Sequence, residues 1–236
     1  MERVSPTKAA HGRVGRPPVT SRAQILAAAR RLIDEAGWEK LTIRRLAAEL
    51  GIGTTTLYHH VRDKGDLLLL LIREYADRIP HPELPSDPRE RIVVAATSIH
   101  DALAAWPWAA EVLTTDGFIT RLSPSALRLV ETIVASAIEA GHTPEQAVHL
   151  FRTIWYFTVG EVLVRAHSAG QRPAAQQPAD TQHFLDGIDT AALPHLAALG
   201  DQWVTLSSRD TYAQGVRALV DGLLGPDARH APASGG

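Results

Sequence analysis

Residues 41–64 read LTIRRLAAELGIGTTTLYHHVRDK, and this stretch determines the fold class. Thr42 opens it, and a threonine hydroxyl can accept hydrogen bonds from the free N–H groups at a helix start. The apolar residues that follow at helical spacing are Ile43, Leu46, Ala47 and Leu50. Gly51 ends this helix because glycine readily adopts positive φ, and Ile52 anchors the turn. The pattern predicts the first helix and the turn of a helix-turn-helix.

A second helix is predicted over residues 55–61, with Thr54 as its cap. Leu57 and Val61 lie four residues apart and pack inward, so the intervening polar side chains point outward. The outward-facing residues are Thr55, Thr56, Tyr58 and His59. In a DNA major groove such side chains can touch thymine methyl groups and hydrogen-bond base edges or phosphates. The alternative is a small helical hairpin with a solvated polar face.

A further helix precedes the motif. Ser21 and Gln24 form a capping-box pattern that opens it, and it continues to about Ala36. Residues 1–20 are rich in proline, glycine and cations and predict a flexible basic arm. The cations of the arm include Lys8, Arg13 and Arg16. Such an arm can follow a minor groove, or it can be a solvated extension without a role.

Charge is divided unevenly along the chain. The formal net charge of −2 would not by itself suggest a nucleic-acid partner. Residues 1–64, however, carry 12 Lys and Arg against 6 Asp and Glu, whereas residues 65–236 carry 12 against 20. Phosphate neutralisation needs cations only at the contact surface, so this division favours a DNA partner.

From Ser21 to Leu71 the chain resembles the DNA-binding part of the TetR family of bacterial transcriptional repressors. The motifs that match at fixed spacing are Ala36-Gly37-Trp38, Leu41-Thr42, Leu46-Ala47, Gly51-Ile52, Leu57-Tyr58-His59-His60-Val61 and Lys64-Gly65-Asp66-Leu67-Leu68. The strand signal is nearly absent. The resemblance implies an all-α protein with an N-terminal three-helix helix-turn-helix head, joined to a larger helical ligand-binding and dimerisation body.

The resemblance also assigns DNA contacts. Base or groove contacts are implied for Thr54, Thr55, Thr56, Tyr58 and His59, and phosphate contacts for Arg44, His60 and Lys64. Lys64 stands at a helix start, where its cation and nearby N–H groups can hold one phosphate together. For Tyr58 and His60 the alternative is a structural role in sealing the head against the body.

A fourth helix is predicted from Asp66 to about Ile79. Its unbroken apolar run, Leu67–Ile72, has six residues, far fewer than the ~20 that a membrane span needs. No apolar leader is seen at the N-terminus, and the chain has no cysteine, so we expect a cytoplasmic protein without membrane contact.

The domain prediction follows from these patterns. The arm is residues 1–20, the helix-turn-helix domain 21–66, the ligand-binding and dimerisation domain 67–224, and a disordered tail 225–236. Residues 80–88 form a proline-rich linker, and residues 168–181 a flexible loop. The helices expected in the larger domain are Arg89–Ala105, Ala109–Thr114, Ser125–Ala140, Pro144–Ala166, Ala191–Leu199 and Thr211–Leu224, with turns at Gly117, Gly141 and Gly225.

Two of these helices carry apolar stripes that are surplus to one core and are expected to meet a second copy. The stripes comprise Val148, Phe151, Ile154, Phe157 and Val162 on one helix, and Tyr212, Val216, Leu219, Val220 and Leu223 on the other. Gly160 and Gly215 would let backbones approach closely, a packing benefit that offsets their poor helix propensity. In the resembled family the equivalent helices form a four-helix dimer interface. The alternative is burial within one subunit.

Aromatic residues suggest a second task for the larger domain, because they gather in the segments that surround the ligand cavity of the resembled family. The expected ligand-binding residues are His100, Trp106, Trp108, Phe118, Phe151, Arg152, Trp155 and Tyr156. Such a lining suits a largely apolar or aromatic molecule with a few polar handles. For any one of these residues the alternative is ordinary core packing.

No cofactor and no metal site are predicted. The larger domain looks most like the tetracycline-repressor branch, but Leu113 and Val164 align with the metal-binding histidine and glutamate of that branch. Neither side chain can coordinate a hard cation, so we expect no magnesium-tetracycline site. Nearby Glu111 or Asp116 could still offer a carboxylate, because the alignment is weak around them.

The function predicted from the sequence is a repressor that binds a palindromic double-stranded DNA operator as a homodimer and is released by a small-molecule inducer. Helix four would be the lever between cavity and recognition helix. One alternative is a DNA-binding protein indifferent to sequence. Another is an enzyme, but no Gly-x-Ser-x-Gly elbow, phosphate-binding loop or dinucleotide fingerprint occurs, and no catalytic residue is assigned.

Overall fold

The structure is a computed structural model that describes residues 20–79, 82–114, 120, 122–170, 191–200 and 202–225. Within these ranges the regular structure is helical and no β-strand occurs, which confirms the all-α prediction. The arm, Phe118, Gly117, most of the predicted 168–181 loop and nearly all of the predicted tail lie outside the described residues. No helix of the described part is long and apolar enough to cross a bilayer.

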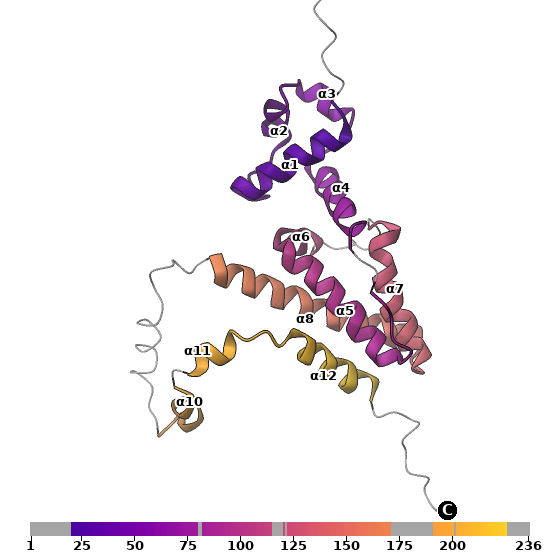
Figure 1. Cartoon of the computed structure of the whole chain (residues 1–236), viewed down its shortest axis with the longest axis vertical. Coiled ribbons are helices and arrows are strands. Elements are labelled where there is room, and N and C mark those ends of the chain that lie inside the picture. The colour runs from indigo at the N-terminus through magenta and orange to yellow at the C-terminus, as the bar shows by residue number, and fades with distance from the viewer. Residues whose placement is uncertain are drawn as a thin grey trace, which may run out of the picture. The chain divides into compact units, whose positions relative to one another are not determined.

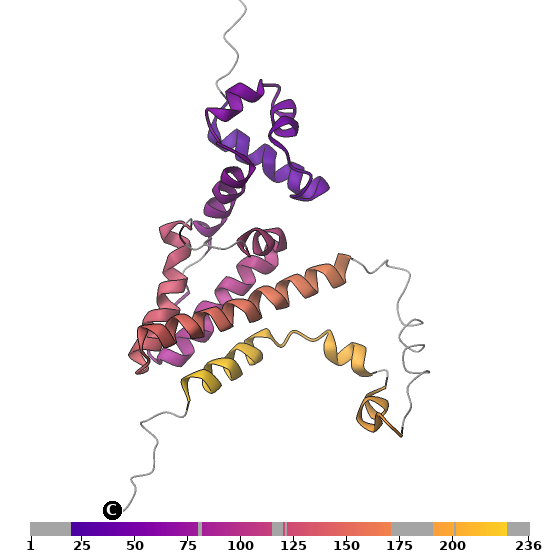
Figure 2. The same ribbon diagram turned by 180° about the vertical axis from the view of Figure 1, so that it is seen from behind.

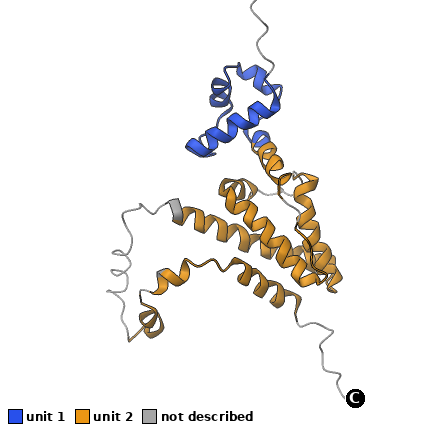
Figure 3. Cartoon of the chain, in the orientation of Figure 1, with its two compact units in different colours: residues 1–67 blue, residues 68–236 orange. Residues whose placement is uncertain are grey.

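The chain divides into two compact units, residues 1–67 and 68–236 (Figure 3). The helices of the first unit are α1 (Arg22–Ala36), α2 (Ile43–Glu49) and α3 (Thr54–Tyr58). Helix α4 (Lys64–Ala76) begins in the first unit and continues into the second.

Helix starts in the first unit follow the predicted capping chemistry. The Ser21 hydroxyl accepts from Gln24 N at 3.2 Å, and the Gln24 side chain accepts from Ser21 N at 2.8 Å, which completes the capping box of α1. The Thr42 hydroxyl accepts from Arg45 N at 3.1 Å and caps α2. Both predicted caps are confirmed.

The turn after α2 depends on a left-handed glycine. Gly51 has φ 65°, its N–H donates to Ala48 O, and the N–H of Ile52 donates to Ala47 O at 3.0 Å. This pair of bonds satisfies helix carbonyls that would otherwise lack partners, and it turns the chain sharply toward α3. The predicted role of Gly51 is confirmed.

Helix α3 differs from its prediction. Its N-cap is Gly53, no side chain caps it, and Thr54 is its first helical residue, so the expected Thr54 cap is wrong. The helix ends at Tyr58, not at Val61, and His59 and His60 form a turn. A five-residue helix holds its place by burying Leu57 rather than by helix propensity.

The second unit is a bundle around α5. Its remaining helices are α5 (Pro88–Ala105), α6 (Pro107–Leu113), α7 (Pro124–Glu139), α8 (Pro144–Gly170), α10 (Pro194–Leu199), α11 (Gln202–Ser207) and α12 (Tyr212–Leu224). Helix α5 packs against α6, α7, α8 and α12, and α12 runs alongside α8 (Figures 1 and 2). Five predicted helices are found within a few residues of their expected bounds, whereas α10 begins later than expected and α11 was not predicted.

The expected surplus stripes prove to be largely core. Ile154 and Val162 on α8 and Tyr212, Val216 and Val220 on α12 are buried within this one subunit. Four small or apolar residues of α8 remain exposed and lie four or eight positions apart: Val148, Tyr156, Gly160 and Val164. The prediction that both stripes face a second copy is therefore wrong for most of the residues named, because these residues are buried where α5, α8 and α12 pack together.

Candidate DNA-contact surface and ligand cavity

Helix α3 presents a polar face. Leu57 and Val61 are buried in the first unit, as predicted. The side chains of the opposite face are exposed: Thr54, Thr55, Thr56, Tyr58 and His59. Tyr58, at 54% exposure, is the largest of them. A row of hydroxyl groups with an exposed aromatic ring and an imidazole offers donors, acceptors and methyl groups on one surface, which is the chemistry that base edges require.

The predicted phosphate-contacting residues occupy three different situations. Arg44 is exposed on α2, and His60 is half-buried after α3. The Lys64 ammonium donates to the Glu39 carbonyl at 2.9 Å and lies 5.0 Å from the centroid of the Trp38 ring. This lysine is thus fixed by its own unit, although an ammonium has three hydrogens and one such bond leaves two for other acceptors.

Two side-chain caps hold the segment between α3 and α4. The Asp63 carboxylate accepts from Asp66 N at 2.7 Å, while Asp66 accepts from Arg62 N at 3.0 Å. The hydrogen bond from the Arg62 backbone, with the nearby Arg62 and Arg22 charges, holds the pKa of Asp66 below its ordinary value. The two carboxylates thus fix the helix start that carries Lys64.

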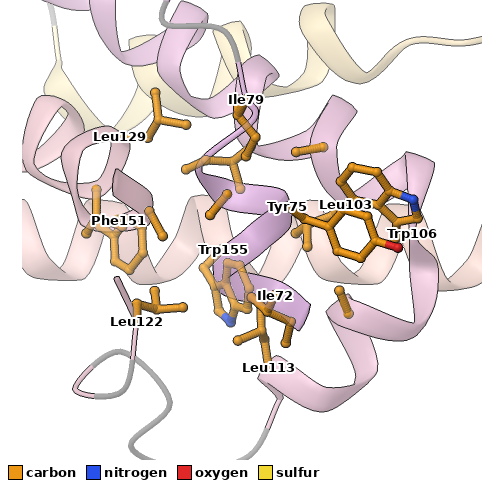
Figure 4. Close-up of a pocket in the computed structure, with 16 residues that line it drawn as sticks. Ile72, Tyr75, Ile79, Leu103, Trp106, Leu113, Leu122, Leu129, Phe151 and Trp155 are labelled. Carbon is orange, nitrogen blue, oxygen red and sulfur yellow. The ribbon is translucent and has the colours of Figure 1, made fainter. Parts of the chain in front are cut away.

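The second unit contains a small apolar cavity of about 90 Å³. Figure 4 shows the rings of Tyr75 and Trp106 at one side of it and Phe151 at the opposite side. Its walls come from α4, α5, α6, α7 and α8 and are almost wholly hydrocarbon. The shape and composition are those of a site for an apolar molecule, but the volume is well below the ~300–1,000 Å³ of sites for drug-sized ligands.

Only part of the predicted ligand-binding set lines this cavity. Trp106, Phe151 and Trp155 do so. Trp108 is half-buried beside the cavity without lining it, and Arg152 and Tyr156 are exposed on α8, so these three predicted residues do not line this cavity. The two groups of α8 residues lie on different faces of the helix. Phe151 and Trp155 point toward the cavity, whereas Arg152 and Tyr156, each one residue further along, are rotated from them by about 100° about the helix axis.

His100 is also misplaced by the prediction. It lies outside the cavity, buried between two carboxylates: its Nε2 is 2.8 Å from Glu161 Oε2 and its Nδ1 is 3.0 Å from Asp101 Oδ1. Its ring stacks on that of Tyr212, with centroids 3.8 Å apart. Glu161 also pairs with Arg165. His100 therefore links α5 to α8 and α12 and does not line the apolar cavity.

The Tyr212 hydroxyl completes this polar cluster. It lies 2.6 Å from Thr158 Oγ1 and donates to the Ala96 carbonyl at 3.2 Å. Burial raises the pKa of Tyr212 to about 12, since the interior disfavours a phenolate. The phenol therefore stays neutral and keeps its hydrogen bonds at all physiological pH values.

Sequence reasoning missed the wall that α4 supplies. Ile72, Tyr75, Ala76 and Ile79 all line the cavity. A signal was present, because these positions continue the apolar run Leu67–Ile72 at spacings of three and four residues. The helix itself was predicted to reach about Ile79, but none of its residues was assigned to the cavity wall.

Leu113 and Val164, which align with the metal-binding residues of the tetracycline-repressor branch, lie in two different environments. Leu113 lines the cavity with hydrocarbon, and Val164 is exposed on α8. In the part of the chain that the structure describes, no three His, Asp or Glu side chains gather as a metal site would require.

Each of the two units matches a family of known proteins. Residues 25–71 match "Bacterial regulatory proteins, tetR family", and residues 81–225 match "Tetracyclin repressor-like, C-terminal domain". The tetracycline repressor protein class A from transposon 1721 of Escherichia coli is 29% identical over 205 residues, which cover 84% of this chain and 88% of that protein. The HTH-type transcriptional repressor DrrR1 of Streptomyces coeruleorubidus is 29% identical over 224 residues, 89% of this chain and 79% of that one. Apo ActR from Streptomyces coelicolor has a similar fold, with a TM-score of 0.70 at 22% identity over 90% of this chain and 98% of its own.

Proposed function

The chain belongs to the tetR family of bacterial regulatory proteins and is a transcriptional regulator, and we propose that it represses transcription by binding a palindromic operator as a homodimer. A small, largely apolar or aromatic ligand in the cavity of the second unit releases it from DNA. The relatives are regulators rather than enzymes, so no catalytic role is proposed.

One observation carries the DNA-binding part of the proposal. Leu57 and Val61 are buried, and this fixes the α3 face of Thr54–Thr56, Tyr58 and His59 outward from a unit with an excess of cations. The hydroxyls and the imidazole contact base edges, and the Tyr58 ring contacts sugar or a thymine methyl. Arg44, His60 and Lys64 contact phosphates, with Lys64 pre-positioned by Glu39 O.

A second copy would join through α8 and α12. Tyr156, Gly160 and Val164 form an exposed row on α8, and position 160 has no heavy atom of another residue within 4 Å of a Cβ added there. Leu223 and Gly222 are exposed on α12. Apolar side chains beside bare glycines suit close packing of helices from two subunits. In such a dimer, two α3 helices about 34–36 Å apart would read successive major-groove faces.

Release requires that the ligand bind two conformations unequally. Helix α4 is the element through which this would act, because it is continuous from Lys64 to the cavity-lining residues Tyr75 and Ala76. A cavity of about 90 Å³ must expand to admit a ligand, and expansion displaces its walls. A coupling of about 1–3 kcal/mol would change operator affinity roughly 5- to 150-fold.

The test is selection of random DNA duplexes by the purified full-length protein. We expect a palindrome bound by two subunits, with affinity that exceeds that for a scrambled duplex by ~10³-fold or more and falls steeply between two salt concentrations. Equal affinity for both duplexes would support the alternative, a DNA-binding protein indifferent to sequence, and would overturn the assignment of α3.

The ligand part is tested separately with N-phenyl-1-naphthylamine, whose fluorescence rises in apolar surroundings. Ala126 lines the cavity from α7 and is half-buried, so Ala126→Trp should fill the space and abolish the signal. Glu131→Ala, at an exposed site on the same helix, serves as the control. Equal fluorescence with all three proteins, each with wild-type circular dichroism, would place the probe elsewhere.

A further inference from the structure

The rings of Tyr75 and Trp106 form a partition. Tyr75 lies on α4, and Trp106 lies at the junction of α5 and α6. Their centroids are 3.6 Å apart and their planes are inclined by 26°, so they are stacked. The apolar cavity lies on one side of this stack (Figure 4), and the same two residues also line a second, open groove of about 400 Å³.

The groove differs from the cavity in chemistry. Ile79 and Ala102 are shared by both, but the rest of the groove is built by Arg78, Pro82, Ser98 and Asp101. The groove thus carries polar and charged groups on a largely apolar lining, whereas the lining of the cavity is almost wholly hydrocarbon. A molecule that occupied both would need an apolar body and a polar end.

The hydrogen bonds of the groove residues indicate what the polar end must be. The Ser98 hydroxyl donates its only proton to Val94 O at 2.9 Å, so it presents acceptor lone pairs. The Asp101 carboxylate is 71% exposed and accepts from His100, with acceptor positions left over. The Arg78 guanidinium pairs with Glu74. On the side of α5 the groove therefore offers acceptors, from Ser98 and Asp101, which fit a hydrogen-bond donor such as an ammonium or a hydroxyl. The Arg78 guanidinium keeps N–H donors elsewhere in the groove.

We propose that the groove is the outer half of the ligand site and that the Tyr75–Trp106 stack parts to join it to the cavity. The ligand class is an aromatic or polycyclic molecule with a donor group at one end; its ring system enters the cavity and its amine or hydroxyl stays by Ser98 and Asp101. Joined, the two spaces reach the size range of small-molecule sites, which the cavity alone does not. This inference rests on the proposed function of the cavity as the ligand site.

The partition is tested by association kinetics of N-phenyl-1-naphthylamine in stopped flow. Trp106→Ala removes half of the stack and should raise the association rate several-fold, whereas Trp106→Phe keeps a ring and should remain near the wild-type rate. Trp108→Ala is the matched control, because Trp108 meets Tyr75 edge-on at 6.2 Å but lines neither space. Association rates equal to the wild-type rate in all three variants would overturn the partition.

The polar half is tested by displacement of that probe with naphthalene, 1-naphthylmethylamine and 1-naphthoate. We expect the amine to displace the probe best and the carboxylate worst. Asp101→Asn keeps an acceptor for His100 but removes the charge, and it should weaken the amine about 5- to 20-fold while naphthalene is unchanged. An amine affinity that Asp101→Asn leaves unaltered would overturn the assignment of the groove.

These experiments distinguish a failure of the groove assignment from a failure of the cavity as the ligand site. If the probe binds and Ala126→Trp blocks it, but the Trp106 and Asp101 variants behave as wild type, the cavity remains the ligand site and the groove is no part of it. If the probe binds to none of the proteins, or Ala126→Trp does not affect it, the ligand function of the cavity itself fails.

Discussion

Gly215 of α12 lies against the ring of Phe157 of α8, so close that a Cβ added at position 215 would be 2.6 Å from Phe157 Cζ. The glycine suspected of serving a contact between subunits thus serves a contact within one. Gly215→Ala should force the ring or the helix to move and destabilise the protein by about 1–3 kcal/mol, measured by urea unfolding. In a Phe157→Leu background the same substitution should cost less, and additive effects of the two changes would contradict this account.

Alkaline unfolding should report Tyr212. Its pKa is about 12 in the folded protein, above the ordinary value of a tyrosine, so the folded state holds the proton more tightly than the unfolded state. That contribution is complete below about pH 10 and is lost as the pH rises toward 12. Tyr212→Phe should flatten the stability profile in this window, whereas Tyr156→Phe, at an exposed site, should leave its slope intact.

Acid stability should depend on Asp66. Its pKa is lowered in the folded protein, so its contribution is present above the unfolded-state pKa and is lost as the pH falls below about 4. Asp66→Asn should lower stability at pH 7 and make the profile below pH 4 shallower, as followed by thermal unfolding. Asp77→Asn, exposed just beyond the end of the same helix, is the control, and an equal response of both variants would remove Asp66 from the account.

Substitutions on α3 and α2 should separate base reading from phosphate binding. Thr55→Ala and His59→Ala are expected to cost about 1–3 kcal/mol on the selected operator and little on a scrambled duplex. Arg44→Ala should weaken both and reduce the slope of log affinity against log salt by about 1. Fluorescence anisotropy at several salt concentrations distinguishes the two patterns; uniform weakening by Thr55→Ala would refute its base contact.

Gly160→Ala should stabilise the protein if α8 is free at this position, and should weaken the dimer if α8 packs there against a second copy. On a free helix face, alanine in place of glycine stabilises by up to about 1 kcal/mol, and position 160 has room for a Cβ within the subunit. In the proposed interface the added methyl group would separate the helices, so the dimer dissociation constant should rise. Analytical ultracentrifugation decides between them, with Glu131→Ala on α7 as the reference.

Local signals made much of this fold predictable. The Ser21 capping box, the Thr42 cap and the left-handed Gly51 each depend on residues a few positions apart, and all three are present as expected. Such interactions need no knowledge of the rest of the chain. The same holds for the larger helices, whose apolar periods are long.

Features that depend on packing could not be read in this way. Helix α11 has six residues and no buried side chain among those described, so no apolar period marks it. His100 was expected at the cavity because it lies among aromatic segments. One of the two carboxylates that bind it, however, belongs to Glu161, which is 61 residues away in the sequence. A sequence period tells which residues share a face, not which partner that face meets.

The hydrogen bonds around His100 also make one side of the second unit more rigid than the other. Directional hydrogen bonds and a ring stack tie α5 to α8 and α12, and such a network resists displacement of any one helix alone. The opposite walls of the cavity, from α4 and α6, contribute mainly apolar side chains, whose attraction is not directional. A cavity enlarged by its contents would therefore yield on the side of α4 and α6, while the exposed row on α8 stays where it is.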